Sequence, residues 1–113
     1  MDRILKYQKA VIDLLEEYRK RYQQSPTLQP EHYVISDKEN HHYQLIEMGF
    51  EDGVFVHRCI FHFDIINEKV WLQVNETDVL IADRLMEYGV PKESIVIGFQ
   101  QPHLRKYTGF AVA

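Results

Sequence analysis

Residues 43–74 read YQLIEMGFEDGVFVHRCIFHFDIINEKVWLQV, and apolar and polar side chains alternate along them in three runs. Alternation with a period of two is typical of strands that bury one face. Asp52-Gly53 is a strong hairpin signal between the first two runs, and Asn67-Glu68 marks a second turn. The segment therefore predicts an antiparallel meander with strands at 43–50, 54–66 and 69–74.

The N-terminal segment 2–23 predicts one long amphipathic helix. Its apolar residues recur every three or four positions and form a stripe, and charged residues occupy much of the remaining surface. Asp2 is a suitable N-cap, and the basic run Arg19 to Arg21 suits the negative end of the helix dipole. Such a stripe normally packs on a sheet of its own chain, although a short coiled coil has the same pattern.

The rest of the chain predicts the remaining elements. Pro26 and Pro30 separate the first helix from the next strand, and Gly89 and Pro91 end a second helix after the meander. These elements are a strand at 32–35, a helix at 79–88 capped by Thr77 or Asp78, a helical turn at 91–94, a strand at 95–99 and a helical turn at 102–106. The pattern predicts one α+β domain over 1–113, in which two helices cover the same face of a mainly antiparallel sheet of four or five strands.

Composition narrows the class of protein. With 113 residues, 45% of them apolar, the chain can bury a core without a metal or a disulfide. The single cysteine excludes an internal disulfide and fits a reducing cytosol. The charged start MDRILKYQKA lacks the apolar run of a signal peptide, and no apolar stretch is long enough to span a membrane. We therefore expect a cytoplasmic protein.

The run HRCIFHFD at 57–64 contains side chains that bind metals or form catalytic pairs in other proteins. On a regular strand it splits between two faces: His57, Cys59, Phe61 and Phe63 on one, and Arg58, Ile60, His62 and Asp64 on the other. Two potential ligands on each face are fewer than zinc needs, so no metal site is predicted. Cys59 is expected to face the core as an inert thiol, and no residue is placed to orient His57 as its base. No catalytic residue and no cofactor is predicted.

The polar face of this strand is a candidate partner-binding surface. His62 and Asp64 form either an ordinary hydrogen bond on an exposed face or part of a contact surface, and a histidine beside a carboxylate can titrate near neutral pH. Trp71 is expected in the core, although an exposed aromatic anchor is the alternative. The C-terminal segment is expected to pack on the sheet, and insertion into a second copy as a homodimer is the alternative. The candidate surface comprises Arg58, His62, Asp64, Trp71, Arg105 and Tyr107.

Three segments carry a resemblance to a known family. The chain resembles the XisI family in HFDIINEKVWLQVNET from residue 62, IADRLMEYGVPKESIVIGFQQP from residue 81 and RKYTGFAVA from residue 105. These proteins are fdxN element excision controlling factors, found largely in cyanobacteria. The resemblance extends over nearly the whole chain and includes the N-terminal helix and the HYQLIEMGF strand.

The resemblance implies a non-enzymatic accessory factor for programmed excision of a DNA element. XisI-type proteins are associated with a second small protein, XisH, whose family resembles restriction-endonuclease-like nucleases, and no catalytic residues carry over. The net charge of −4 fits a protein partner better than bare DNA. The alternative is a DNA-binding accessory protein that uses Arg19 to Arg21 or Arg105-Lys106. A third interpretation is a small enzyme that uses His62 and Asp64.

Overall fold

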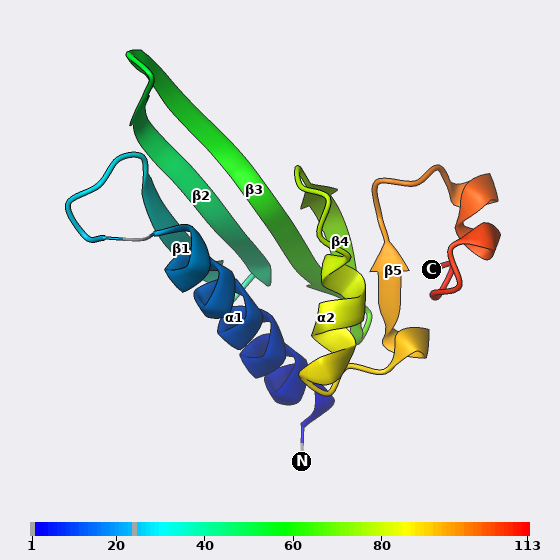
Figure 1. Ribbon diagram of the computed structural model, residues 1–113. Helices are drawn as coiled ribbons and strands as arrows, with labels where there is room; N and C mark the ends of the chain where they lie inside the picture. Colours follow the sequence, from blue (N-terminus) through cyan, green and yellow to red (C-terminus); the bar gives the residue numbers. More distant parts are fainter. Residues whose placement is uncertain (1, 24) are drawn as a thin grey trace.

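The alternating segment forms three long antiparallel strands, as predicted (Figure 1). Both tight turns between them have positive φ at their two central residues, with 51° and 80° at Asp52-Gly53 and 50° and 60° at Asn67-Glu68. This left-handed pair matches the right-handed twist of a hairpin, and glycine, asparagine and aspartate adopt it at least cost. The hairpin signals in the sequence are therefore confirmed.

The computed structural model describes residues 2–23 and 25–113. In chain order the elements are α1 (Arg3–Tyr22), β1 (Glu31–Asp37), β2 (His42–Glu51), β3 (Val54–Ile66), β4 (Lys69–Asn75), α2 (Ile81–Glu87), the 3-10 helix η1 (Lys92–Ser94), β5 (Ile95–Ile97) and the 3-10 helix η2 (Pro102–Tyr107). The sheet order is β1-β2-β3-β4-β5; the first four strands are antiparallel, and β5 is parallel to β4. The predicted α+β class with a mainly antiparallel sheet is confirmed.

The long N-terminal helix forms as predicted. The Asp2 carboxylate accepts a hydrogen bond from the Ile4 backbone N–H at 2.9 Å and so acts as the N-cap. The helix is 20 residues long, and its last turn contains three basic residues. In the described part of the chain, no helix combines the length and the apolar character that crossing a membrane requires.

The second helix is shorter than predicted. It begins at Ile81 rather than Val79, and the Thr77 hydroxyl accepts a hydrogen bond from the Val79 backbone N–H instead of capping the helix. Asn75 holds the same turn, because its side-chain amide donates to the Val79 carbonyl at 2.8 Å. Thr77, one of the two residues predicted to cap the helix, therefore helps to build the turn that precedes it.

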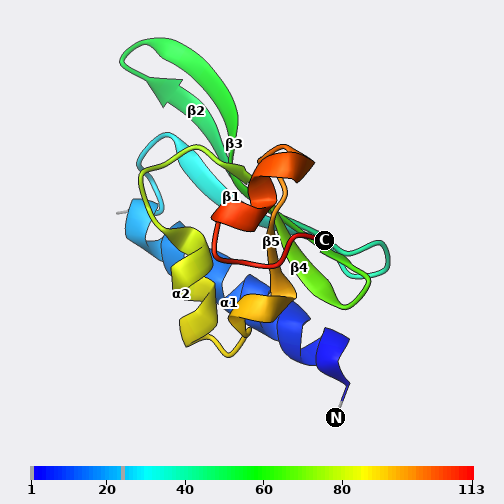
Figure 2. The ribbon, with the colours of Figure 1, turned by 90° about the vertical axis from the view of Figure 1, so that its right-hand side faces the viewer.

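Both helices lie side by side on one face of the sheet, as predicted (Figures 1 and 2). One core cluster joins the helices to the inward face of the sheet. Its fully buried members include Leu14 and Leu15 from α1, Phe61 and Phe63 from β3, and Leu85 from α2. Because alternate side chains of β2, β3 and β4 enter this core, their neighbours point to the opposite face, here called the open face.

A β-bulge changes which side chains of β3 share a face. Leu45 pairs with Phe61 but Ile46 pairs with Cys59, so Ile60 is an extra residue in β3. Ile60 and Phe61 are both buried in the helix-side core. On the N-terminal side of the bulge, the side chains of residues 54–59 therefore point to the faces opposite to those expected for a regular strand. The predicted division of this strand into two faces is wrong for residues 57–60, because it assumed an unbroken period of two.

The C-terminal segment packs on its own chain. The Ala111 backbone N–H donates to the Ile95 carbonyl at 2.8 Å, and Ala111 forms a parallel bridge with Val96 at the edge of the sheet. Phe110 packs against the core cluster. This arrangement agrees with the expectation that the apolar end lies on the sheet.

Candidate functional site: a His-Asp-His cluster on the open face

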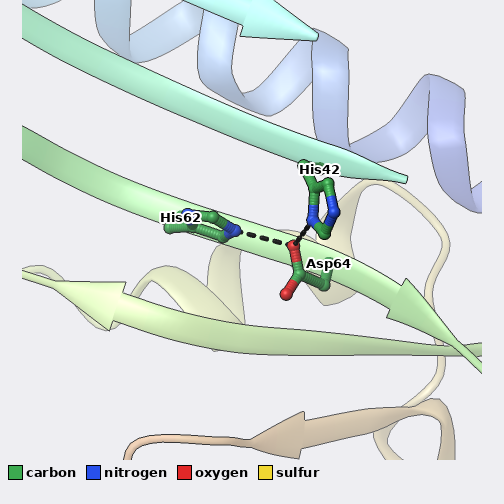
Figure 3. Close-up of side chains that lie close together, drawn as sticks. All are labelled: His42, His62 and Asp64. Carbon is green, nitrogen blue, oxygen red and sulfur yellow. Dashed lines mark hydrogen bonds and ion pairs between the residues drawn. The ribbon is translucent and has the colours of Figure 1, made fainter. Parts of the chain in front are cut away.

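Three titratable side chains meet on the open face where β2 and β3 run side by side (Figure 3). His42 pairs directly with Asp64, and the next open-face pair is Gln44 with His62. Directly paired residues on neighbouring strands share a face. The flanking residues Tyr43 and Phe63 are fully buried on the helix side, which forces these polar side chains outward.

The two imidazoles converge on one carboxylate oxygen. His42 Nδ1 lies 2.7 Å from Asp64 Oδ1, and His62 Nε2 lies 2.6 Å from the same oxygen. The rings are 6.0 Å apart at an edge-to-face angle. Asp64 is 13% exposed and His62 22%, whereas His42 is 54% exposed. The cluster is thus partly enclosed and open to solvent on the side of His42.

Two glutamines surround this cluster. Gln44 Nε2 lies 2.9 Å from His62 Nδ1, the ring nitrogen that does not contact Asp64. Gln73 donates from its amide to Asp64 Oδ2 at 3.2 Å. Both carboxylate oxygens and both nitrogens of His62 therefore have a polar neighbour.

The electrostatics of the cluster favour an ionised Asp64. Burial alone would raise the pKa of Asp64, but hydrogen bonds from His42, His62 and Gln73 outweigh it and hold the pKa below its usual value. The hydrogen bond to Asp64 and its negative charge raise the pKa of His42 above the ordinary value for histidine. The chemistry available is that of a carboxylate flanked by two imidazoles, which suits proton exchange or binding of a cation.

Arg58 does not join His62 and Asp64, contrary to the prediction. The bulge directs it to the helix side, where it pairs with Glu47 and, at 3.2 Å, with Glu51. Glu47 in turn lies 3.4 Å from His32, whose ring stacks on Tyr22 of α1. Arg58 is therefore engaged in an ion-pair network next to the helix.

The position of Cys59 also differs from the prediction, in the opposite sense to Arg58. It pairs with Ile46 and so lies on the open face, not with Phe61 in the core as predicted. Burial still raises the pKa of its thiol, and Sγ lies 3.3 Å from the Phe61 carbonyl. The expected low reactivity is supported by this environment, although the expected position is wrong.

Trp71 shares the open face with Asp64 and lies outside the core cluster, so its predicted core position is wrong. The Arg105 guanidinium covers its ring at 5.0 Å and donates to the carbonyls of Gln100 and Gly98 at 3.0 and 3.2 Å. Through its contact with Trp71 of β4, Arg105 thus connects η2 to the sheet. Tyr107 is 75% exposed on η2.

Sequence reasoning missed His42, Gln44 and Gln73. His42 precedes the predicted strand by one residue, and its position beside His41 suggests a solvated loop. The strand in fact begins at His42. His42 lies two residues before Gln44, and residues two apart on a strand share a face. This spacing was the signal that could have placed His42 on the polar face.

A second feature of the open face is apolar. Five large apolar side chains on this face are between 36% and 58% exposed: Tyr33 and Ile35 of β1, Met48 and Phe50 of β2, and Phe55 of β3. The Phe50 and Phe55 rings meet edge to face at 5.2 Å. We call these five residues the apolar surface.

The XisI protein family matches residues 1–112. This chain belongs to the XisI family. The resemblance drawn from its three sequence segments is therefore confirmed. No curated protein matches the chain.

Two crystal structures of XisI-type proteins, both from Anabaena variabilis ATCC 29413, are similar over their full length. A XisI-like protein is 40% identical, with a TM-score of 0.86 over 97% of this chain and 99% of that protein. The fdxN element excision controlling factor XisI is 25% identical, with a TM-score of 0.83 over 99% of this chain and 100% of that protein. The fold described above is thus shared with both relatives. The name of the second relative, together with the family, supports a role in control of excision.

Proposed function

We propose that this XisI-family protein is a non-enzymatic controlling factor for programmed excision of a DNA element, and that it acts by binding a XisH-type, nuclease-like protein. The family supports the role in excision control. The observation that supports a protein partner is the apolar surface, because contiguous exposed apolar side chains commonly mark protein interaction sites.

The apolar surface ends in a projecting hairpin. β1 pairs with β2 only as far as Met48, and β4 pairs with β3 only from Phe61 onward. Residues 49–56 therefore extend beyond the neighbouring strands as a two-stranded ribbon, which is visible at the top of Figures 1 and 2. A two-stranded ribbon is marginal in water by itself, so contact with a partner would stabilise it.

The aromatic residues of this hairpin have the character of interface anchors. Phe50 is 58% exposed and Phe55 is 57% exposed, and rigid aromatic rings bury large areas at low entropic cost. The tip carries the carboxylate of Asp52, whereas Glu51 pairs with Arg58 on the helix side. Aromatic anchors near an acidic group suit a partner whose surface is basic around an apolar pocket.

Three of the five basic groups of the DNA-binding alternative, those of Arg19, Arg21 and Arg105, are already engaged. Arg19 pairs with Glu16 at 2.8 Å and Arg21 with Glu17 at 2.7 Å, so carboxylates offset both charges. Arg105 covers Trp71 and bonds to backbone carbonyls. These contacts, together with the net charge of −4, favour the protein partner over direct contact with phosphates.

The decisive experiment is co-expression with a XisH-type protein, followed by size-exclusion chromatography with light scattering. We expect a stable mixed complex that the double variant F50S/F55S loses. The matched control is Leu5→Gln, which removes an apolar side chain that is 56% exposed on α1, away from the hairpin.

Two outcomes would contradict the proposal. A lone homo-oligomer that takes up no partner would point to a homodimer through the apolar surface. A salt-sensitive shift of duplex DNA by the protein alone would instead favour the DNA-binding accessory function.

A further inference from the structure

We propose that His42, His62 and Asp64 form a binding site for one divalent transition-metal ion, with Zn²⁺ as the best match. Each of the three side chains offers one ligand atom, and these atoms all lie within 4.8 Å of one another. His42 Nδ1 and His62 Nε2 are the nitrogens in contact with Asp64 Oδ1. This inference is independent of the identity of the protein partner.

The spacing of the donor atoms is close to what a tetrahedral ion requires. Ligands about 2.0–2.1 Å from a tetrahedral zinc ion lie roughly 3.4 Å from one another. Both imidazole nitrogens are at hydrogen-bond distance from Asp64 Oδ1, at 2.7 and 2.6 Å. Binding an ion at the centre of the three donors therefore requires both imidazole nitrogens to move away from Asp64 Oδ1, which rotation about the side-chain bonds allows.

The surrounding groups resemble the outer layer of a metal site. A histidine ligand normally hydrogen-bonds through its second ring nitrogen, which fixes the ring orientation, and a carboxylate ligand is held through its other oxygen. Gln44 is the hydrogen-bond partner of the second ring nitrogen of His62, Nδ1. Gln73 holds the other oxygen of Asp64, Oδ2. The Gln44 amide can present its oxygen as well as its nitrogen, so it can accept the proton that a metal-bound His62 carries on Nδ1.

The three ligands come from rigid parts of the fold. His42 and Asp64 are a directly paired position of β2 and β3, and the buried residues Tyr43 and Phe63 anchor the backbone on either side. Ligands on paired strands hold their geometry better than ligands on loops, which lowers the entropic cost of binding.

The donor set selects the class of ion. Two imidazoles and one carboxylate suit zinc and its neighbours among the transition metals, whereas calcium and magnesium prefer oxygen ligands alone. Three protein ligands leave at least one coordination position free, as in zinc sites that bind water or a further ligand. His42 is 54% exposed, so that position faces solvent.

The test is a zinc titration of the tag-free, chelator-treated protein by isothermal calorimetry. We expect one ion per chain, and loss of binding in His62→Gln and in Asp64→Asn. Gln44→Leu leaves the three ligands in place and should weaken binding by about tenfold, the usual cost of removing an outer partner. The matched control is His57→Gln, since His57 lies on the same strand and face but pairs with Met48 outside the cluster.

Failure to bind zinc in the wild-type protein would overturn the site, as would binding that persists in the double variant H62Q/D64N. Circular dichroism shows whether each variant folds. If the ligand variants do not fold, the visible spectrum of wild-type protein with Co²⁺ decides: intense bands of four- or five-coordinate cobalt support the site, and the weak spectrum of hydrated cobalt contradicts it.

Discussion

Arg84 of α2 donates two hydrogen bonds to the carboxylate of Glu17 of α1, at 2.7 and 2.6 Å. Tyr88 also donates to this carboxylate. These contacts connect two helices that are distant in the sequence and hold them at the same position along the sheet.

The first prediction concerns the pH dependence that this contact creates. The hydrogen bond from Tyr88, with those from Arg84, keeps the pKa of Glu17 below its ordinary value of 4.5 despite the opposing effect of burial. A carboxyl group with a depressed pKa in the folded state stabilises the fold above its unfolded pKa, and the contribution disappears as the pH falls through the folded pKa. We expect Glu17→Gln to lower the free energy of unfolding at pH 7 by no more than about 1 kcal/mol, since the pair is partly exposed.

Urea denaturation at pH 7 and at acidic pH checks this. The difference between wild type and Glu17→Gln should shrink as the pH falls below 4.5. Glu16→Gln, which removes an ion pair within α1 only, is the control. A difference that does not change with pH would contradict the role assigned to Glu17.

The second prediction contrasts two phenylalanines of the same strand. Phe61 is fully buried, and its ring meets Tyr18 of α1 edge to face at 5.6 Å. Phe61→Ala should cost about 3–5 kcal/mol of stability because it leaves a cavity under the helix. Phe55 is 57% exposed, and Phe55→Ala should cost about 1 kcal/mol or less. Thermal unfolding of both variants measures the contrast, and equal losses would mean that the hairpin is buried in the free protein.

The third prediction concerns the close approach at Gly49 in β2. Its φ is +139°, and an added Cβ would lie 3.1 Å from the Pro30 Cα and would collide with the Gln29 side chain. That side chain accepts a hydrogen bond from the Phe50 backbone N–H at 2.9 Å. Gly49→Ala should therefore cost about 1–3 kcal/mol and loosen the hairpin.

Gly53 at the hairpin tip is the control for this effect. Its φ is also positive, at +80°, but an added Cβ would meet nothing within 4 Å. Gly53→Ala should therefore cost only the backbone term of about 1 kcal/mol. Denaturant midpoints that rank the two variants in the reverse order would show that the contact with Gln29 and Pro30 does not constrain β2.

The fourth prediction uses Trp71, the only tryptophan of the chain, as a probe of η2. Arg105→Ala removes the guanidinium that covers the indole ring, so the fluorescence of Trp71 should shift to longer wavelength as water reaches the ring. The loss of stability should be about 0.5–1 kcal/mol, as for a partly exposed cation–π contact. Lys106→Ala, which removes a contact with Tyr107 instead, should leave the emission unchanged.

Much of the fold could be predicted from local pattern. The helix over 2–23, the meander over 43–74 and both tight turns depend on the period of apolar residues and on residues that tolerate positive φ, which are properties of neighbouring residues in the chain. The family resemblance depends likewise on the order and spacing of motifs. The error at the start of α2 arose because the Thr77 side chain bonds to the turn rather than capping the helix.

The composition of the candidate site was decided by tertiary structure. The single extra residue Ile60 reversed the alternation of β3, which sent Arg58 to the helix side and Cys59 to the open face. Strand register then placed His42 opposite Asp64, a partner 22 residues away that no pattern within one strand reveals. Local alternation specifies which residues can be buried, whereas bulges and register, set by how the whole sheet packs against its helices, determine which polar side chains meet.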